Sequence, residues 1–352
     1  MTVIYVLFGI LMFGVLIAIH ELGHFSAAKL LGVKVNEFSV GMGPAIVQKQ
    51  YGETVYSWRS IPIGGFCAME GEDEDTGDPR AFTRQAAWKR AIILVAGSFM
   101  NFLLGFIIVF FLFINAAGFR SPTVVDFMEG CPYESADGFQ KNDRIVRIDG
   151  HRVYQYSDIL DFLSPEQEKY DIVLKRGAEK VELKNYRLVP VEYKNEEGKK
   201  YGFYFGIDEA TFGNKLYYSW GTTMEFTRWV WKGLKMLFAG EVKMDDMSGP
   251  VGIVDLMAET GENAASFGDG LLDILYLGAF IAVNLAIMNM LPIPAMDGGR
   301  VFLLIVTRII EAITRKKLDP KYEGYIHAAG MVLLLLLMAV IMFNDIVKIV
   351  TK

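Results

Sequence analysis

The sequence has few of the residues from which covalent cross-links or thiolate sites are made. Its 352 residues include two cysteines, Cys67 and Cys131, which form no Cys-x-x-Cys pair. This excludes a disulfide framework and a zinc–thiolate site, so each cysteine is expected to be a small buried apolar residue. An excess of positive charge is also missing, because the net charge is −6. A nucleic-acid binder would normally show a basic face, so that class is disfavoured.

No charged side chain precedes His20 in the long apolar run that opens the chain. No Lys or Arg precedes this run and no small-residue cleavage site follows it, so it is not typical of a signal peptide. The run ends in "HELGH", which holds two of the four histidines in the chain, and the others are His151 and His327. Because polar groups are costly in a membrane, the presence of two histidines and a glutamate at the end of such a run indicates a functional site.

The chain is 52% hydrophobic and 22% charged, which indicates several membrane spans together with a water-soluble part. Four apolar runs reach the roughly 20 residues that cross a bilayer, at 3–31, 91–117, 271–290 and 325–347. Lys and Arg are concentrated after the first run and after the third. By the positive-inside rule, both of these segments are expected in the cytoplasm, and residues 118–270 with both termini outside.

The segments between the runs differ in pattern. Residues 35–66 alternate apolar and polar side chains and are expected to form two or more short strands, with turns at "GMGP" and "YGET". A strand edge there could pair with an extended peptide, although a purely structural sheet fits as well. Residues 70–78 are acidic and are expected to be a solvated loop. Residues 119–208 indicate a soluble α+β module, and 216–239 a Trp-rich helix, either in the membrane interface or packed under that module.

The motif His20-Glu21-Leu22-Gly23-His24 predicts a metal site. Positions i and i+4 lie on one face of a helix, so both imidazoles can reach one ion. Glu21 falls beside that face and can act as a base on water, while Gly23 leaves room for a close neighbour. Zinc suits neutral imidazoles and lowers the pKa of bound water to about 7. The motif also occurs by chance in soluble helices, but inside a membrane run the histidines need partners.

A catalytic zinc usually has three protein ligands, so a third must come from elsewhere in the chain. His151 lies in the expected external module, and His327 opens the fourth run. Asp297, in "NMLPIPAMDGGR", fits better, because two prolines break the third run near its cytoplasmic end. His20 lies about 17 residues, or roughly 26 Å, into the first run and therefore at matching depth. The alternative role for Asp297 is that of a helix cap or turn residue.

Four motifs spread over nearly the whole chain resemble those of the site-2 protease family of intramembrane zinc metalloproteases. The similarity is to the bacterial group that includes the regulator of sigma-E protease. The motifs are HELGH at 20–24, GSFMN at 97–101, GPVGI at 249–253 and NMLPIPAMDGG at 289–299. Met296 stands where the family usually has leucine before the aspartate, a change that conserves volume.

The resemblance implies a role for each motif. The residues implied as ligands of one zinc ion per chain are His20, His24 and Asp297. Glu21 would be the general base. Asn289 would lie near the substrate or the transition state, although an amide that packs between helices is the alternative. Gly97 and Asn101 would be structural residues near the site, with Asn101 bonding between spans.

The resemblance also implies the fold class, a polytopic α-helical membrane protein of about four transmembrane helices with an inserted α+β PDZ domain and a membrane-associated β-hairpin region. The stretch "KNDRIVRIDGHRV" matches the strand and turn signature of PDZ modules. The expected segments are the first span with HExxH (1–31), a cytoplasmic loop with β-hairpins (32–90), the second span (91–117), an extracytoplasmic PDZ domain (118–210), an amphipathic interfacial segment (211–270), the third span with the Asp-Gly motif (271–299), a cytoplasmic loop (300–323) and the fourth span (324–352).

The expected function is hydrolysis of peptide bonds within transmembrane segments of membrane-anchored substrates, such as anti-sigma factors or signal-peptide remnants. The expected setting is the bacterial cell (inner) membrane, with the active site near the cytoplasmic side. Expected partners are these substrates, the lipid bilayer and an upstream site-1 type protease, with no nucleic acid. The alternative is a non-catalytic membrane peptide receptor or chaperone with a structural zinc. Glu21 favours the enzyme, because a structural site needs no base; a metal transporter would need more polar residues in its spans.

Overall fold

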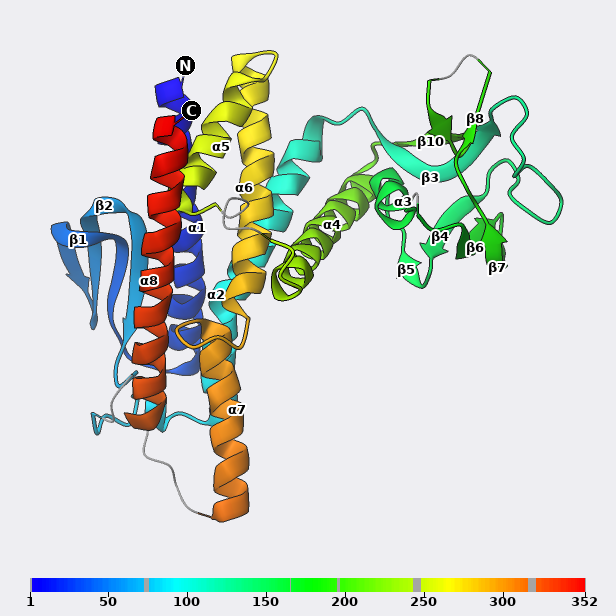
Figure 1. Ribbon diagram of the computed structural model, residues 1–352. Helices are drawn as coiled ribbons and strands as arrows, with labels where there is room; N and C mark the ends of the chain where they lie inside the picture. Colours follow the sequence, from blue (N-terminus) through cyan, green and yellow to red (C-terminus); the bar gives the residue numbers. More distant parts are fainter. Residues whose placement is uncertain are drawn as a thin grey trace. The chain divides into compact units, whose positions relative to one another are not determined.

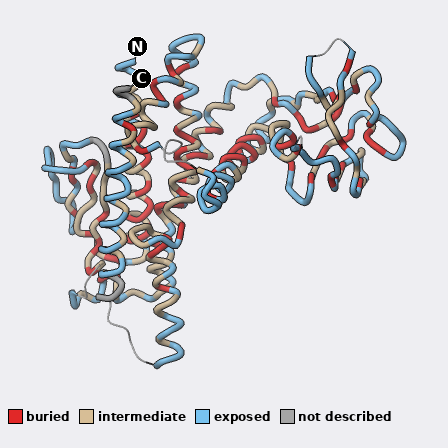
Figure 2. The backbone as a smooth tube through the Cα atoms, in the orientation of Figure 1, coloured by how far each residue is buried: buried red, intermediate tan, exposed pale blue. Residues whose placement is uncertain are grey.

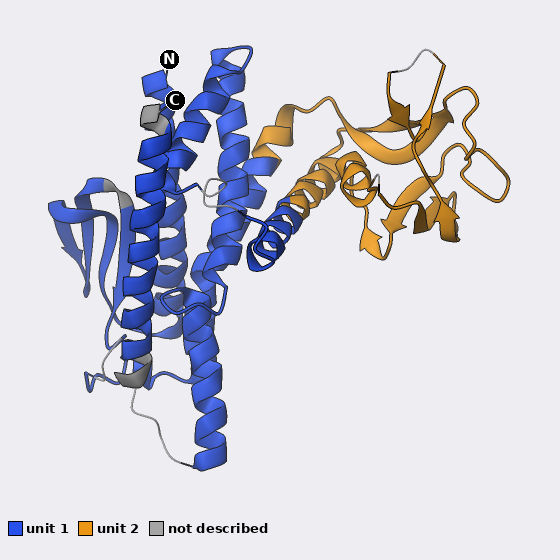
Figure 3. Ribbon diagram, viewed as in Figure 1, with its two compact units in different colours: residues 1–109, 226–352 blue, residues 110–225 orange. Residues whose placement is uncertain are grey.

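The computed structural model describes residues 2–72, 76–164, 166–194, 197–242, 248–315 and 321–351. Within them the chain divides into two compact units (Figure 3). One consists of residues 1–109 and 226–352, and the other of residues 110–225. Three residues of the acidic stretch predicted to be a loop, 73–75, lie outside the described residues, as do Lys316 and Lys317 of the basic segment.

Four helices in the described part of the chain are long and apolar enough to cross a membrane. They are α1 (Thr2–Leu31), α2 (Ala87–Leu112), α6 (Phe267–Asn289) and α8 (Lys321–Thr351). These helices confirm the four predicted spans and fit a multi-pass membrane protein. α6 begins a turn earlier than its apolar run, because the Ser266 side chain caps it by accepting a hydrogen bond from the Asp269 N–H.

The first unit is built around α1, which packs against α5 (Pro250–Glu262) and α6 (Figure 1). Tyr5 and Leu16 of α1 are buried together with Met257 of α5 and Ile274 of α6. Buried positions follow the inner sides of these helices, and their outer sides are exposed (Figure 2). An apolar helix with an exposed apolar face is what a lipid environment permits.

A long hairpin follows α1. It consists of β1 (Val35–Tyr51) and β2 (Thr54–Met69), joined by a turn at Gly52 and Glu53. The turn predicted at "YGET" is therefore confirmed. The one predicted at "GMGP" lies inside β1 instead, where the pairing register shifts and Gly41 and Gly43 have positive φ. Glycine adopts these dihedrals without the steric cost that a Cβ would add.

The two halves of β1 pair with different parts of β2. Residues 45–51 pair with 54–59, whereas residues 37–40 lie between 65–68 on one side and 55–58 on the other. Within the described chain, the last part of β2 therefore has a pairing partner on one side only. That edge of the sheet has backbone N–H and C=O groups available to an additional strand.

The segments between the later spans are more helical than predicted. The prediction of a loop at 300–323 is wrong up to Thr314, because α7 (Asp297–Thr314) occupies that part. Val301, Leu304 and Ile305 repeat at helical spacing, and Leu304 is buried. Lys and Arg report the side of the membrane but not the secondary structure, which is why they did not indicate this helix.

The Trp-rich segment forms α4 (Phe212–Phe238), which confirms the helix predicted at 216–239. Within the first unit, the second half of α4 packs on α6. The ring of Phe226 is fully buried, and its centroid lies 5.1 Å from that of Tyr276 and 5.5 Å from that of Phe280. One face of the helix is thus covered by aromatic contacts, while Trp231 on another face is 50% exposed.

The second unit is an α+β module, as predicted for 119–208. Its main sheet has the order β10-β3-β4-β6-β7, and β5 pairs with β4. The remaining bounds are β3 (Gly118–Phe127), β4 (Arg144–Ile148), β5 (His151–Arg152), α3 (Tyr156–Phe162), β6 (Lys169–Arg176), β7 (Glu179–Arg187), β8 (Val191–Glu192), β9 (Lys199–Lys200) and β10 (Phe203–Glu209). Phe139, Ile148 and Leu174 belong to its buried core. Gln155 and Asp158 form a capping box at the start of α3.

Candidate metal centre

Three side chains converge where α1 meets the start of α7. His20 and His24, one turn apart on α1, have their Nε2 atoms 3.2 Å from each other. Asp297, the first residue of α7, has Oδ2 3.1 Å from Nε2 of His20 and 3.3 Å from Nε2 of His24. Both histidines are buried, and Asp297 is half-buried. The structure thus brings together two motifs that are far apart in the sequence.

The spacing of these three atoms fits a zinc ion. Zinc bonds of about 2.0–2.2 Å in a tetrahedron place neighbouring ligand atoms about 3.3–3.6 Å apart. The three separations here are 3.1, 3.2 and 3.3 Å. Oδ2 of Asp297 is also buried without a hydrogen bond of acceptable geometry among the described residues. Three lone-pair atoms facing one another are favourable when a cation lies between them, and three protein ligands leave the open position of a catalytic site.

Both imidazoles are held from behind. Nδ1 of His24 lies 2.8 Å from the Ile93 carbonyl oxygen, so Nδ1 carries the proton and Nε2 is left with a lone pair for a metal. Nδ1 of His20 lies 3.5 Å from Nδ2 of Asn101, whose Oδ1 is buried and has no partner in the described chain. Exchanging the nitrogen and oxygen of this amide would let Oδ1 accept the Nδ1–H of His20, which satisfies both groups. In that orientation Asn101 of α2 would support His20.

Two glycines allow α1 and α2 to approach at this level. A Cβ on Gly23 would lie 2.4 Å from the Ala96 carbonyl oxygen. A Cβ on Gly97 would lie 2.4 Å from Nε2 of His24 and 2.8 Å from Cε1 of His20. Real Cβ atoms do not occur at such distances, so position 97 has no space for any side chain beside the imidazoles.

Gly97→Ala is expected to lower zinc affinity by at least about 10-fold, because the new methyl group must displace one imidazole from the centre. Competition with a chromophoric chelator measures this affinity in the purified protein. Gly233→Ala is the matched control, because no atom lies within 4 Å of a Cβ built on Gly233 in α4. Unchanged zinc affinity in folded Gly97→Ala would contradict the close packing of Gly97 on the imidazoles.

Glu21 is not part of this cluster and faces the sheet. Its Cγ lies 3.5 Å from the position that a Cβ of Gly65 would take in β2. The carboxylate is half-buried, next to the metal centre and beside the free edge of β2. A position outside the ligand cluster but next to it is compatible with a base that acts on water.

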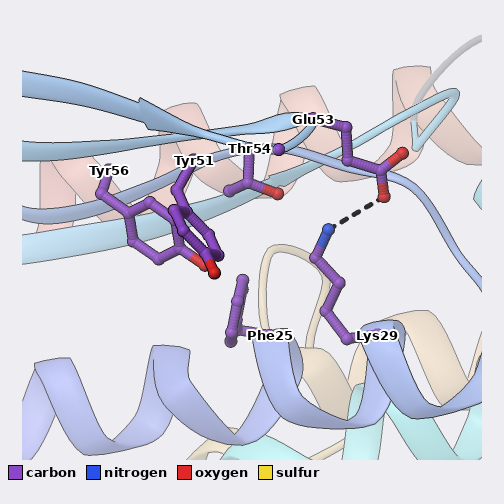
Figure 4. A pocket seen from close by; sticks show the side chains of 7 residues that line it. Phe25, Lys29, Tyr51, Glu53, Thr54 and Tyr56 are labelled. Atoms are coloured by element: carbon purple, nitrogen blue, oxygen red, sulfur yellow. Dashed lines mark hydrogen bonds and ion pairs between the residues drawn. The ribbon is translucent and has the colours of Figure 1, made fainter.

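The same face of α1 continues with Phe25 and Lys29 at four-residue spacing. They line an open pocket of about 490 Å³ between α1 and the β1–β2 turn (Figure 4). Tyr51 and Tyr56 complete its aromatic wall, and Lys29 Nζ donates a hydrogen bond to Glu53 at 2.9 Å. None of the three candidate ligands lines this pocket, so it lies beside the metal centre and not at it.

The remaining candidates lie elsewhere. Asn289 is the last residue of α6; it is half-buried, and its side chain has no hydrogen-bond partner within the described residues. His151 is exposed in the second unit. His327 of α8 does not join the cluster, but its Nδ1 accepts a hydrogen bond from the N–H of Ala295, two residues before Asp297. The sequence indicated His327 only as a possible metal ligand and gave no sign of this contact.

Comparison with known proteins agrees with these motifs. The model of peptidase family M50 matches residues 8–337. A predicted zinc metalloprotease of Clostridium acetobutylicum is 36% identical over 97% of this chain and 97% of its own length. The zinc metalloprotease RasP of Shouchella clausii is 29% identical over 96% and 98% of the two chains. The regulator of sigma-W protease RasP of Bacillus subtilis is 26% identical over 96% and 97%. The chain therefore belongs to peptidase family M50, the site-2 protease family of membrane metalloproteases that its motifs indicated.

Proposed function

We propose that this M50 metalloprotease hydrolyses peptide bonds within the transmembrane segments of membrane-anchored proteins. The observation that carries the proposal is the cluster of Asp297 with His20 and His24, which lie on a helix apolar enough to span a bilayer. The similarity to a regulator of sigma-W protease suggests a membrane-anchored regulator, such as an anti-sigma factor, as substrate. Signal-peptide remnants have the same chemistry and are a second substrate class.

In this proposal His20, His24 and Asp297 hold one zinc ion, and Glu21 is the general base. Zinc, when bound, supplies a Lewis acid for the scissile carbonyl and lowers the pKa of a water to about 7. Glu21 accepts a proton from the attacking water and later donates it to the leaving amine. The proton-free Nε2 atoms of the two histidines are maintained by their Nδ1 contacts with Ile93 and Asn101.

The free edge of β2 is the proposed binding place for the substrate backbone. A transmembrane helix hides its carbonyl groups in internal hydrogen bonds, so the substrate must unwind before it can be cut. An unwound segment that pairs with β2 would regain backbone hydrogen bonds. Gly65 of this edge lies against Glu21, so the paired segment would pass the base. Asn289 is proposed to donate a hydrogen bond to the substrate backbone or to the developing oxyanion.

The second unit is proposed to be an extracytoplasmic PDZ domain. Its antiparallel sheet with one short helix, and the strand pair around "RIVRIDG", support this assignment. The distribution of Lys and Arg supports a membrane orientation in which the metal centre is near the cytoplasmic side of a bacterial cell membrane. In that position the PDZ domain would sort substrates after an upstream site-1 type protease has trimmed their external parts.

Removal of zinc is expected to stop cleavage of a transmembrane model peptide by the purified protein. Treatment with a chelator should reduce cleavage to background, and Zn²⁺ should restore it. Mg²⁺ should not, because it prefers octahedral oxygen ligands to imidazole. Mass spectrometry of the peptide measures cleavage and locates the cut. A zinc-free protein that cleaves at the original rate would contradict the proposed function, and intact zinc binding without cleavage of any varied peptide would favour a receptor.

A further inference from the structure

The loop that precedes Asp297 contacts α8. Residues 290–296 connect α6 to α7, and this loop runs beside α8 (Figure 1). The N–H of Ala295 donates a hydrogen bond to Nδ1 of His327, with 3.2 Å between the nitrogen atoms. Three residues further along α8, a Cβ on Gly330 would lie 2.4 Å from Cβ of Pro294. One histidine and one glycine of α8 therefore fix two successive residues of the loop.

Ala295 is a position where this loop needs support. Its φ is +80°, a left-handed conformation that is unfavourable for a residue with a Cβ. Gly298 and Gly299 crowd the same turn, because Cβ atoms there would lie 2.2 Å from the Met290 carbonyl oxygen and 2.1 Å from that of Ile293. The dihedral angles of Ala295 set the direction in which the chain enters α7. They therefore influence the position of the Asp297 carboxylate at the start of that helix.

α8 is itself anchored at its far end. The buried carboxylate of Asp345 accepts hydrogen bonds from the N–H groups of Gly249 and Gly252, each at 2.9 Å. These groups lie at the start of α5, where the helix dipole also favours a negative charge. Between the two anchors, every residue of α8 from 328 to 344 is exposed or only partly buried. The helix is thus located by polar contacts near its ends and not by its apolar middle.

From these contacts we infer that His327 is a positioning residue for the metal centre. Its Nδ1 lone pair holds the N–H of Ala295, keeps the strained turn in place and so fixes the carboxylate of Asp297 opposite the two imidazoles. The inference rests on the proposed ligand role of Asp297. It requires His327 to be the neutral tautomer with the proton on Nε2.

Two substitutions separate the hydrogen bond from the volume of the ring. His327→Leu removes the acceptor and keeps an apolar side chain of similar reach. His327→Asn keeps an acceptor, because the amide oxygen of asparagine is as many bonds from the backbone as Nδ1 of histidine. His151→Leu makes the same change at an exposed site in the other unit and is the control.

The test measures zinc affinity by chelator competition and amide hydrogen exchange of the 290–296 segment, with the full chain in detergent. His327→Leu is expected to bind zinc about 10-fold more weakly, the usual effect of losing a support behind a ligand. The same variant should show faster exchange at Ala295. His327→Asn and His151→Leu should both stay within about 3-fold of the wild type in affinity. The helical content measured by circular dichroism should be the same in all variants.

The inference is overturned if folded His327→Leu keeps the zinc affinity and the Ala295 amide exchange rate of the wild type. It is also overturned if His327→Asn binds zinc as weakly as His327→Leu. Neither readout requires proteolysis, so failure of the protease proposal leaves this test intact. Asp297→Ala in the same affinity assay distinguishes the two. If that variant still binds zinc normally, the proposed ligand set fails, while exchange at Ala295 continues to report on the hydrogen bond to His327.

Discussion

Glu21→Gln is expected to leave zinc bound and to lower the rate of peptide cleavage by about 10²- to 10⁴-fold, the usual contribution of a general base. Glutamine has the shape of glutamate but cannot take a proton from the attacking water. Glu21 lies outside the cluster formed by His20, His24 and Asp297, so zinc content should not change. Elemental analysis of the purified variant and single-turnover cleavage of a transmembrane peptide give the two quantities.

The result also separates a protease from a receptor that uses zinc structurally. Glu179→Gln, at an exposed position of β7, is the matched control and should cleave like the wild type. Equal cleavage by Glu21→Gln and wild type would remove Glu21 from the mechanism. Loss of zinc from Glu21→Gln would show that the carboxylate supports the metal, in conflict with its position against Gly65 of the sheet.

The sequence allows prediction of the metal centre because its determinants are of two simple kinds. The spacing of His20 and His24 follows from helix geometry, which is local. Asp297 is predicted as the third ligand from its expected depth in the membrane. That depth is read from the position of a residue within its apolar run. Both arguments use only positions along the sequence, so these three residues can be grouped without knowledge of any tertiary contact.

The supports around the centre could not be predicted in this way, because each depends on a contact between distant helices; only the family resemblance implied that Gly97 and Asn101 lie near the site. Gly97 matters because its Cα faces two imidazoles of another helix. The role of His327 depends on a hydrogen bond to a loop whose left-handed turn at Ala295 has no glycine to reveal it. The pairing of β2 with both halves of β1 also depends on register, which alternation alone leaves open.

Asp297→Ala is expected to reduce zinc affinity by more than about 10-fold, because loss of a direct ligand must cost at least as much as loss of a support behind one. The substitution removes the one oxygen that completes the three-ligand set, and two imidazoles alone hold the ion weakly. Cleavage should fall to background with the zinc. Thermal unfolding gives a second readout, because a ligand that binds the native state raises its stability.

At the same concentration, Zn²⁺ should therefore raise the Tm of the wild type much more than that of Asp297→Ala. Asp345→Asn is the informative comparison, because it changes a buried carboxylate that contacts α5 and is absent from the candidate ligand cluster. Its Tm should fall without zinc, yet it should still rise when Zn²⁺ is added. If Asp297→Ala shows the same Zn²⁺-dependent rise, then Asp297 acts only at the start of α7, where an acidic residue is favourable for the helix dipole, and the third ligand must lie elsewhere.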